Sequence, residues 1–232
     1  MKRFLPFLSL LIILSSCDVL KTVAQPTGGG ITEVEAGGGI KEALSQGLAK
    51  AVTQLNRTDG FFGDAIYKIL LPPDAVRIER TLRNIGMGSM VDRAILSINR
   101  GAEEAVGKAT PIFANAIRSM TLQDALGLVR NDDTSITHFF RSKTSQQLMA
   151  AFTPVIQGSL DATDATKHYG DIITTYNKLP TTMRKLNPDL VGFVCERTTN
   201  ALFDQVSKEE KNIRSNPVAR GTDLLRKVFG GR

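Results

Sequence analysis

Three residues in the second half of the chain have the types and the spacing of metal ligands. Asp164, His168 and Asp171 are four and three residues apart, so a helix would place them on one face. Carboxylate and imidazole groups together suit divalent metals. Asp164 is also a good helix-capping residue, however, and three ligands on one helix need a fourth from elsewhere. We keep these residues as candidate metal ligands but predict no metal or other cofactor.

Paired carboxylates are the second group of residues that could carry chemistry. Glycan hydrolysis uses two carboxyl groups held at a defined separation in space. Adjacent pairs occur at Glu103-Glu104, Asp132-Asp133 and Glu209-Glu210. Neighbouring residues on a helix point in different directions, so we interpret the two glutamate pairs as solvated helix faces and expect Asp132-Asp133 to form a turn.

A glycine-rich loop combines acids with aromatic side chains. It reads Asp59-Gly60-Phe61-Phe62-Gly63-Asp64 and is expected to lie between helices. Two adjacent Phe residues can either fill a core or form an exposed aromatic finger, and filling a core is the commoner outcome. Because acids beside aromatic rings could also contact a sugar or a lipid, Phe61 and Phe62 are candidate binding residues.

The rest of the catalytic inventory is thin. The chain has two histidines, and it lacks the nucleophile-elbow, metalloprotease and phosphate-loop motifs. Cys195 follows the apolar run Leu190–Val194, which favours a buried, inert thiol, and no histidine stands nearby to activate it. The sequence therefore does not predict a catalytic residue.

The positive charge of the chain is concentrated at its C-terminal end. The net charge is +6, and residues 211–232 hold six basic residues against one acidic residue, a local charge of +5. Arg220, Arg226 and Lys227 are candidate binding residues for anionic lipid headgroups or envelope glycans. The alternative interpretation is a solvated helix end whose cations complement the helix dipole. Nucleic acid is not an expected partner if the chain is exported.

The N-terminus has the features of an export signal. Lys2 and Arg3 precede an apolar run, residues 4–14, that is too short to span a bilayer. The run ends in Leu14-Ser15-Ser16-Cys17, which resembles the lipobox of bacterial lipoproteins. That resemblance implies cleavage before Cys17 and attachment of lipid, including palmitate, to this residue. An ordinary secretory signal and an uncleaved membrane anchor are the alternatives.

These features divide the chain into three parts. Residues 1–16 are the predicted lipoprotein signal peptide, residues 17–31 the lipidated Cys17 with a flexible tether, and residues 32–232 the domain. The predicted location is the bacterial cell envelope, lipid-anchored and facing the periplasm. The sequence is compatible with either the inner or the outer membrane.

The domain has the apolar periodicity of helices and no convincing strand pair. With no Trp and only 11 Phe in the chain, small aliphatic residues must supply most of the core, which favours helices. We predict an all-α, single compact domain of eight or nine helices. The first helix is expected over 32–55, with a capping box of Thr32 and Glu35 and a frayed start at Gly37-Gly38-Gly39. The next ranges are 74–85, with Ile78, Leu82 and Ile85 inward, and 89–108, after which Pro111 either kinks this helix or begins a new one that ends near Met120. The remaining ranges are one between Thr121 and Asn131, 134–160, 164–178, 189–215 and 218–229.

Several segments in order resemble a known bacterial family. They are residues 40–47, 59–63, 121–127 and 214–225. The chain is similar, over nearly all of residues 31–230, to domain of unknown function 4197. The resemblance implies an all-helical exported domain, often on a lipoprotein, and it implies no activity. This chain has Arg220-Gly221-Thr222-Asp223 where the family usually has Arg-Thr-Thr-Asp.

Two functional hypotheses follow from the sequence. The first is a non-catalytic envelope lipoprotein, held to the membrane by lipid on Cys17, that binds or helps to assemble an envelope protein, an anionic lipid or a glycan. The second is a hydrolase that acts on envelope polymers through carboxylates near residues 59–64 or 164–171. The second hypothesis requires these carboxylates to line one cleft.

Overall fold

The computed structural model describes residues 32–129, 134–178 and 185–230. All of them belong to one compact unit, residues 31–232, which is separate from residues 1–30. The signal peptide, Cys17 and the tether therefore lie outside the described residues.

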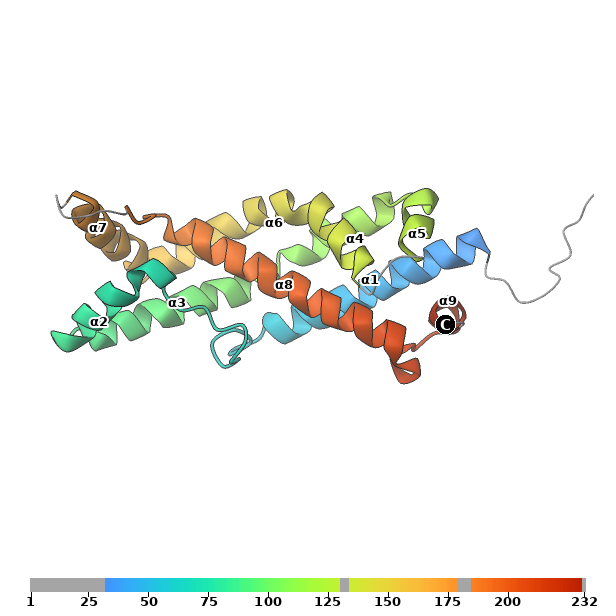
Figure 1. Ribbon diagram of the computed structural model, residues 1–232, viewed down its shortest axis with the longest axis horizontal. Helices are drawn as coiled ribbons and strands as arrows, with labels where there is room; N and C mark the ends of the chain where they lie inside the picture. Colours follow the sequence, from blue (N-terminus) through green and yellow to red (C-terminus); the bar gives the residue numbers. More distant parts are fainter. Residues whose placement is uncertain (1–31, 130–133, 179–184, 231–232) are drawn as a thin grey trace, which may run out of the picture. The chain divides into compact units, whose positions relative to one another are not determined.

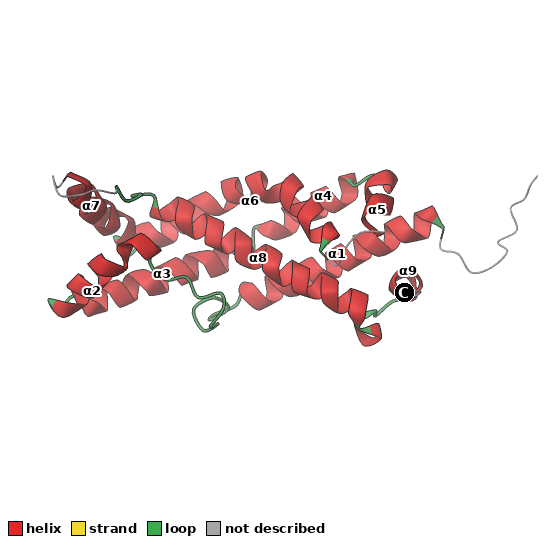
Figure 2. Ribbon diagram, viewed as in Figure 1, coloured by secondary structure: helices red, strands yellow, loops and turns green. Residues whose placement is uncertain are grey.

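The described residues are helical and contain no strand, which confirms the predicted all-α class (Figure 2). Nine α-helices and two short 3-10 helices account for the regular structure of these residues. The elements are α1 (Glu33–Leu55), η1 (Pro73–Ala75), α2 (Val76–Asn84), α3 (Gly88–Val106), α4 (Ala109–Ser119), α5 (Leu122–Val129), α6 (Ser135–Asp161), α7 (Ala165–Lys178), α8 (Leu190–Ser215), η2 (Pro217–Ala219) and α9 (Asp223–Phe229).

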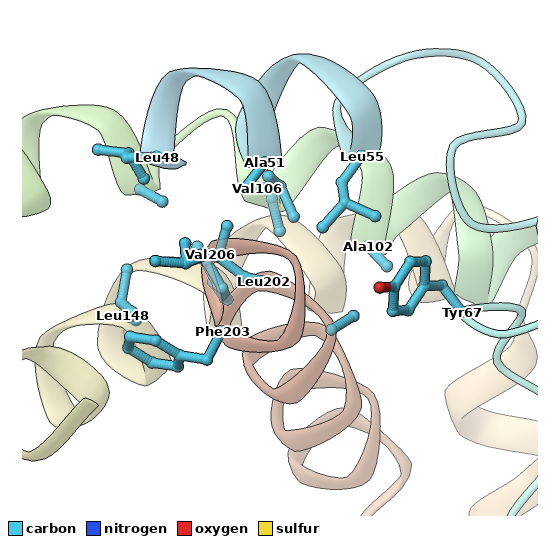
Figure 3. Packing of buried hydrophobic residues seen from close by; sticks show 14 of the residues in the cluster. Leu48, Ala51, Leu55, Tyr67, Ala102, Val106, Leu148, Leu202, Phe203 and Val206 are labelled. Carbon is cyan, nitrogen blue, oxygen red and sulfur yellow. The ribbon is translucent and has the colours of Figure 1, made fainter. Parts of the chain in front are cut away.

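The long helices α1, α3, α6 and α8 build the core (Figure 1). Helix α8 packs against α1 and α6, and α3 packs against α6. Figure 3 shows side chains of these four helices converging, with Leu48 and Leu55 from α1, Val106 from α3 and Phe203 from α8. Burial of this apolar surface is the main term that stabilises the arrangement.

Helix α1 begins as the sequence predicts. The hydroxyl of Thr32 accepts from the Glu35 amide, and the Glu35 carboxylate accepts from the Thr32 amide, which completes a capping box. The three glycines that predict a frayed start are helical. Their small size serves packing, because a Cβ atom on Gly39 would lie 2.4 Å from the Val228 side chain of α9.

Two predicted details are wrong. The last helix does not run from residue 218 to 229; η2 and an irregular turn precede α9, which begins at Asp223 with Thr222 as its cap. Ile85 does not face inward, because α2 ends at Asn84 and the Ile85 side chain is 64% exposed. Of the two effects predicted for Pro111, a kink or a new helix, the structure has a new helix: α4 begins at Ala109, two residues before Pro111.

Helices α3 and α6 approach closely through small residues. The Ser97 hydroxyl donates to the Ser159 carbonyl at 2.5 Å, and the Ser159 hydroxyl donates to the Ser97 carbonyl at 3.1 Å. A Cβ atom on Gly101 would lie 2.9 Å from the Ser159 Cβ. This contact fixes the position of α3, the helix that carries Asn99, Arg100 and Glu103.

Candidate functional site

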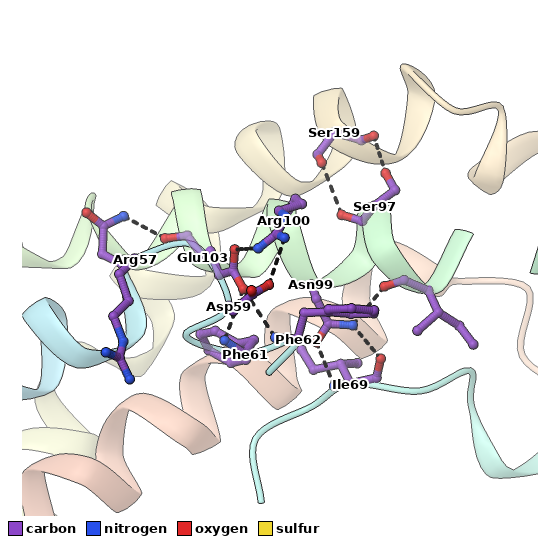
Figure 4. A network of polar contacts seen from close by, with 12 residues as sticks. Arg57, Asp59, Phe61, Phe62, Ile69, Ser97, Asn99, Arg100, Glu103 and Ser159 are labelled. Carbon is purple, nitrogen blue, oxygen red and sulfur yellow. Dashed lines mark hydrogen bonds and ion pairs between the residues drawn. The ribbon is translucent and has the colours of Figure 1, made fainter. Parts of the chain in front are cut away.

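Glu103 is the centre of a polar network beneath the glycine-rich loop (Figure 4). Its side chain is almost completely buried on α3, and its Oε1 accepts from the Phe61 and Phe62 amides at 3.1 and 3.2 Å. Its Oε2 pairs with Arg100 at 2.6 Å, and Arg100 also pairs with Asp59. The expected solvated face is therefore wrong for Glu103, because its carboxylate satisfies loop amides 41 and 42 residues away.

Asparagine side chains hold the two ends of the same loop. Asn99 on α3 accepts from the Ile69 amide at 2.9 Å and donates to the Ile69 carbonyl at 2.8 Å, as a neighbouring strand would. Asn56 donates to the Glu103 carbonyl at 2.6 Å. The loop is thus fixed by side chains of α3 and serves the fold.

The two aromatic residues of the loop have different environments. Phe61 is completely buried in the core, and therefore offers no surface to a ligand. Phe62 is partly buried, and its ring is covered by the Lys68 ammonium at 4.1 Å and by the Arg100 guanidinium at 5.8 Å. The pair does not form an exposed aromatic finger.

A tyrosine joins this loop to α8. The Tyr67 hydroxyl donates to Asp204 at 2.6 Å and accepts from Lys208 at 2.6 Å. Burial, and then the hydrogen bond to Asp204, raise the pKa of Tyr67. The phenol therefore stays protonated at neutral pH, which suits a structural tie between the loop and α8.

Glu210 of α8 is a second buried carboxylate, and it lies against the N-terminus of α6. It accepts from the Thr137 amide at 2.9 Å and the Thr137 hydroxyl at 2.6 Å, and it pairs with Arg214 at 2.9 Å. An anion at a helix N-terminus is favoured by the unpaired amides and by the helix dipole. The expected solvated face is wrong here too. Asp132-Asp133 lies outside the described residues.

The C-terminal cations that the sequence singles out have intramolecular partners. Arg220 is buried and donates to the Ile213 and Arg214 carbonyls at 2.9 and 2.6 Å. Arg226 pairs with Asp223 at 2.6 Å, and Lys227 pairs with Glu35 at 2.7 Å. Arg220 thus stabilises the turn before α9, whereas Arg226 and Lys227 stay on the surface.

The candidate metal ligands stand on one exposed part of the chain. His168 and Asp171 lie on α7, and Asp164 precedes it with a left-handed φ of 54°. Over residues 32–129, 134–178 and 185–230, no group of three or more His, Cys, Asp or Glu side chains is arranged to hold a metal ion. Asp64 lines a hollow formed by α1, the loop that follows α1, and Gln205 of α8. The hydrolase hypothesis requires the acids of this loop and of α7 to line one cleft, and this hollow does not bring them together.

Cys195 is completely buried on α8, as its apolar context predicts. Burial raises the pKa of its thiol. A thiol that is protonated and out of contact with solvent is a poor nucleophile.

An apolar groove lies between α2, α3 and α7; we call it the α2–α7 groove. Helix α2 contributes Ile78 and Leu82, and η1 and the preceding loop contribute Ala75 and Leu71. The other apolar walls are Met90, Val91 and Ala94 of α3, Ala165, Ile172 and Ile173 of α7, and Leu190 of α8. Among the described residues that line it, Thr163, His168 and Tyr169 supply the polar side chains.

The groove differs from the core in the exposure of its walls. Ile78, Leu82, Met90 and Ile172 are half-buried, although each has a fully apolar side chain. Helix α2 buries none of its residues completely. Contiguous, partly exposed apolar surface with a few polar groups at its edge is the usual character of a binding site.

Other hollows of the described surface are more polar. One of about 360 Å³ lies between α4, α5 and α6 and is lined by Asn115, Ser119, Asp124, Lys143 and other residues. Another of about 420 Å³ lies beside Arg57, Asp64 and Gln205. The α2–α7 groove is therefore the best candidate for a site that binds an apolar ligand.

Sequence reasoning misses this groove. Ile78 and Leu82 have the spacing of core residues, and the sequence signals nothing about how loosely α2 packs. Separately, none of the described helices has the length and apolar content needed to cross a bilayer.

The chain was compared with known families, curated proteins and solved structures. Residues 30–230 match the family model described as "Protein of unknown function (DUF4197)". No curated protein and no solved structure matches the chain. Because the match covers nearly the whole described unit, the chain belongs to the DUF4197 family.

Proposed function

We propose that the protein is a lipid-anchored, non-catalytic binding module of the bacterial cell envelope, and that its ligand is the acyl chain of a lipid. The anchoring part of the proposal rests on the signal sequence and on the lipobox ending at Cys17. With Cys17→Ser, the protein should move from the membrane fraction to the soluble fraction of the cell. Retention of the C17S protein in the membrane fraction would contradict the lipid anchor.

The α2–α7 groove is the observation that favours an acyl chain. Its walls are aliphatic on three helices, and among its described lining residues only Thr163, His168 and Tyr169 have polar side chains. A glycan would need many hydrogen-bonding groups, which the groove lacks. A hydrocarbon chain gains about 0.8 kcal/mol for each methylene removed from water, so it is the ligand that these walls favour.

The arrangement of the acids favours binding over hydrolysis. Glu103 and Glu210, the buried carboxylates described above, are occupied by backbone amides and by Arg100 and Arg214. Neither belongs to the lining of the α2–α7 groove. The described residues that line the groove therefore supply no pair of carboxyl groups that could act as acid and base.

Filling the groove tests this proposal. Residues 31–232, which form a compact unit of their own, would be titrated with a fluorescent fatty acid. We expect the unsubstituted protein to bind the probe, and we expect Ala94→Phe to weaken binding at least tenfold, because the ring occupies the groove.

Ala116→Phe is the matched control. Ala116 is also partly buried on a helix, but it lines the polar hollow between α4, α5 and α6. This variant should bind the probe as the unsubstituted protein does, with both variants folded by circular dichroism. Equal binding by A94F and the unsubstituted protein would show that the groove is not the site.

A further inference from the structure

Helix α2 has two chemically different faces. Ile78 and Leu82 face the α2–α7 groove. Arg77 and Arg80 are exposed, and neither forms an ion pair with a described residue. An apolar face bordered by arginines is the pattern of helices that lie in the interface of an anionic membrane.

The attachment of α2 to the rest of the protein is slight. None of its residues is completely buried, and its packing partners are α3 and η1. One side chain ties its end to α3: Arg83 pairs with Asp92 at 2.8 Å while also pairing with Glu79 of its own helix at 2.9 Å. These contacts are exposed, and exposed ion pairs contribute little to stability.

The two ends of α2 differ in backbone freedom. Pro72 and Pro73 precede it at η1, and because their rings fix φ, this end is stiff. Gly86 follows it with a φ of 85°, and a Cβ atom at Gly86 would meet nothing within 4 Å. The turn at Gly86 is held by hydrogen bonds from the Gly86 amide to the Arg83 carbonyl and from the Met87 amide to the Leu82 carbonyl. Because glycine adopts more backbone angles than other residues, Gly86 is the position at which α2 can pivot.

The free volume of the groove makes such a motion necessary for binding. It is about 50 Å³, about a third of the volume of an engineered apolar cavity of about 150 Å³ that admits one benzene molecule. A chain of several methylenes can enter only if one wall moves. Since α3 and α7 contribute completely buried residues to the core, and α2 does not, α2 is the wall that can move.

We propose that α2 is a lid that opens transiently in solution and is held open when the protein meets an anionic lipid surface. The apolar face of α2 then leaves the groove and inserts into the acyl region of the membrane, while Arg77 and Arg80 contact the phosphate headgroups. The opened groove then faces the lipid from which a chain is taken or to which it is delivered. This inference rests on the proposed function, because it assigns the lid to the same acyl-binding groove.

Vesicle binding tests the charge requirement. Residues 31–232 would be centrifuged with vesicles of phosphatidylglycerol and phosphatidylcholine, and with phosphatidylcholine alone. One cation near an anionic surface changes affinity about fivefold, so Arg77→Gln with Arg80→Gln should weaken binding to the anionic vesicles about thirtyfold. Lys108→Gln with Lys211→Gln removes the same charge from two exposed positions outside α2 and should have little effect.

A tryptophan reporter tests whether the lid opens. The chain has no Trp, so a single introduced Trp reports one position. In Leu82→Trp the ring starts against the groove, and lipids with brominated chains should quench its fluorescence only if α2 leaves the groove. Ile85→Trp reports the exposed end of the same helix, and Val218→Trp, at a residue 90% exposed on η2, is the control.

The outcomes separate the lid from its alternatives. Quenching of L82W and I85W, without quenching of V218W, supports the proposal. Quenching of I85W alone would mean that α2 touches the membrane without opening. Equal loss of vesicle binding in the two glutamine double variants would mean that only the net charge of the protein matters. Either result overturns the lid proposal. If vesicle binding fails while A94F still abolishes fatty-acid binding, the lid inference is wrong and the acyl-binding function stands.

Discussion

Two adjacent glutamates on α3, Glu103 and Glu104, have different environments and should contribute differently to stability. Glu104 is exposed to solvent, whereas Glu103 is 5% exposed and accepts two backbone hydrogen bonds. A buried amide that loses its acceptor costs about 1–3 kcal/mol. Residues of the same type at neighbouring positions should therefore differ sharply in their effect on stability.

Replacing each glutamate by alanine measures this difference. We expect Glu103→Ala to lower the free energy of unfolding by about 3 kcal/mol, because the Phe61 and Phe62 amides and Arg100 lose their acceptor. Glu104→Ala, the matched control, should change it by less than about 0.5 kcal/mol. Urea unfolding of both variants provides the measurement, and similar losses would show that Glu103 does not hold the loop.

The sequence alone could not identify Glu103 or Glu210 as buried. Both belong to adjacent glutamate pairs in helical sequence, which is also the pattern of a solvated face. Their acceptor role depends on amides 41 to 74 residues away, at Phe61, Phe62, Ile136 and Thr137. Helical periodicity reports which face of a helix a residue occupies, and says nothing about which distant backbone will lie there.

Glycines inside helices serve different purposes in different elements. Gly39 of α1 lies against Val228 of α9, with no room for a Cβ atom. Gly158 of α6 and Gly170 of α7 have nothing within 4 Å of the position that a Cβ would take. Alanine normally stabilises a helix relative to glycine by about 1 kcal/mol, so the environment decides the sign of the change.

Gly39→Ala and Gly158→Ala should thus change the free energy of unfolding in opposite directions. We expect G158A to raise the free energy of unfolding by about 0.5–1 kcal/mol, and G39A to lower it by about 1–3 kcal/mol through overpacking against α9. Thermal unfolding of the two variants gives the comparison. A G39A variant as stable as G158A would mean that α9 does not pack on α1 at this point.

Helix existence could be predicted from the sequence, and several helix ends could be as well. The capping box at Thr32 and the start of α4 near Pro111 are local signals, and the structure confirms them. The turn before α9 could not be predicted in this way. It depends on Arg220 donating to two carbonyls at the end of α8, which periodicity does not reveal.

At the scale of the whole molecule, an ion pair joins the first described helix to the last. Lys227 of α9 pairs with Glu35 of α1, 192 residues away in the sequence. The hydrogen bond from Lys227, and then those from Thr32, lower the pKa of Glu35 from 4.5 to about 2. A carboxyl group whose pKa is lowered by folding stabilises the folded state most at pH values where it is ionised in both the folded and the unfolded protein.

The sign of the pH effect follows from this shift. The contribution of Glu35 is complete above its unfolded pKa of 4.5 and is lost as the pH falls through about 2. We expect Glu35→Gln to be less stable than the unsubstituted protein at pH 6, and the difference to shrink between pH 4.5 and 2. Denaturant titrations across this range test it, and a difference independent of pH would exclude the ionised pair as the cause.

The all-α class of the whole domain could be predicted, but its candidate site could not. Composition and periodicity define helices that bury one face. The α2–α7 groove arises because α2 packs loosely on the apolar surface beneath it. The sequence of a loosely packed helix has the same spacing of apolar residues as that of a tightly packed one, so periodicity cannot distinguish the two.

The loop of residues 56–72 has a consequence for folding. Its amides at Phe61, Phe62 and Ile69 find their acceptors on α3, so the loop cannot be ordered before α3 is in place. It is also unable to open by itself without exposing Phe61 from the core. Although it has no regular structure, this segment should exchange its protected amide hydrogens only when the helices around it separate, at the slow rate of global unfolding.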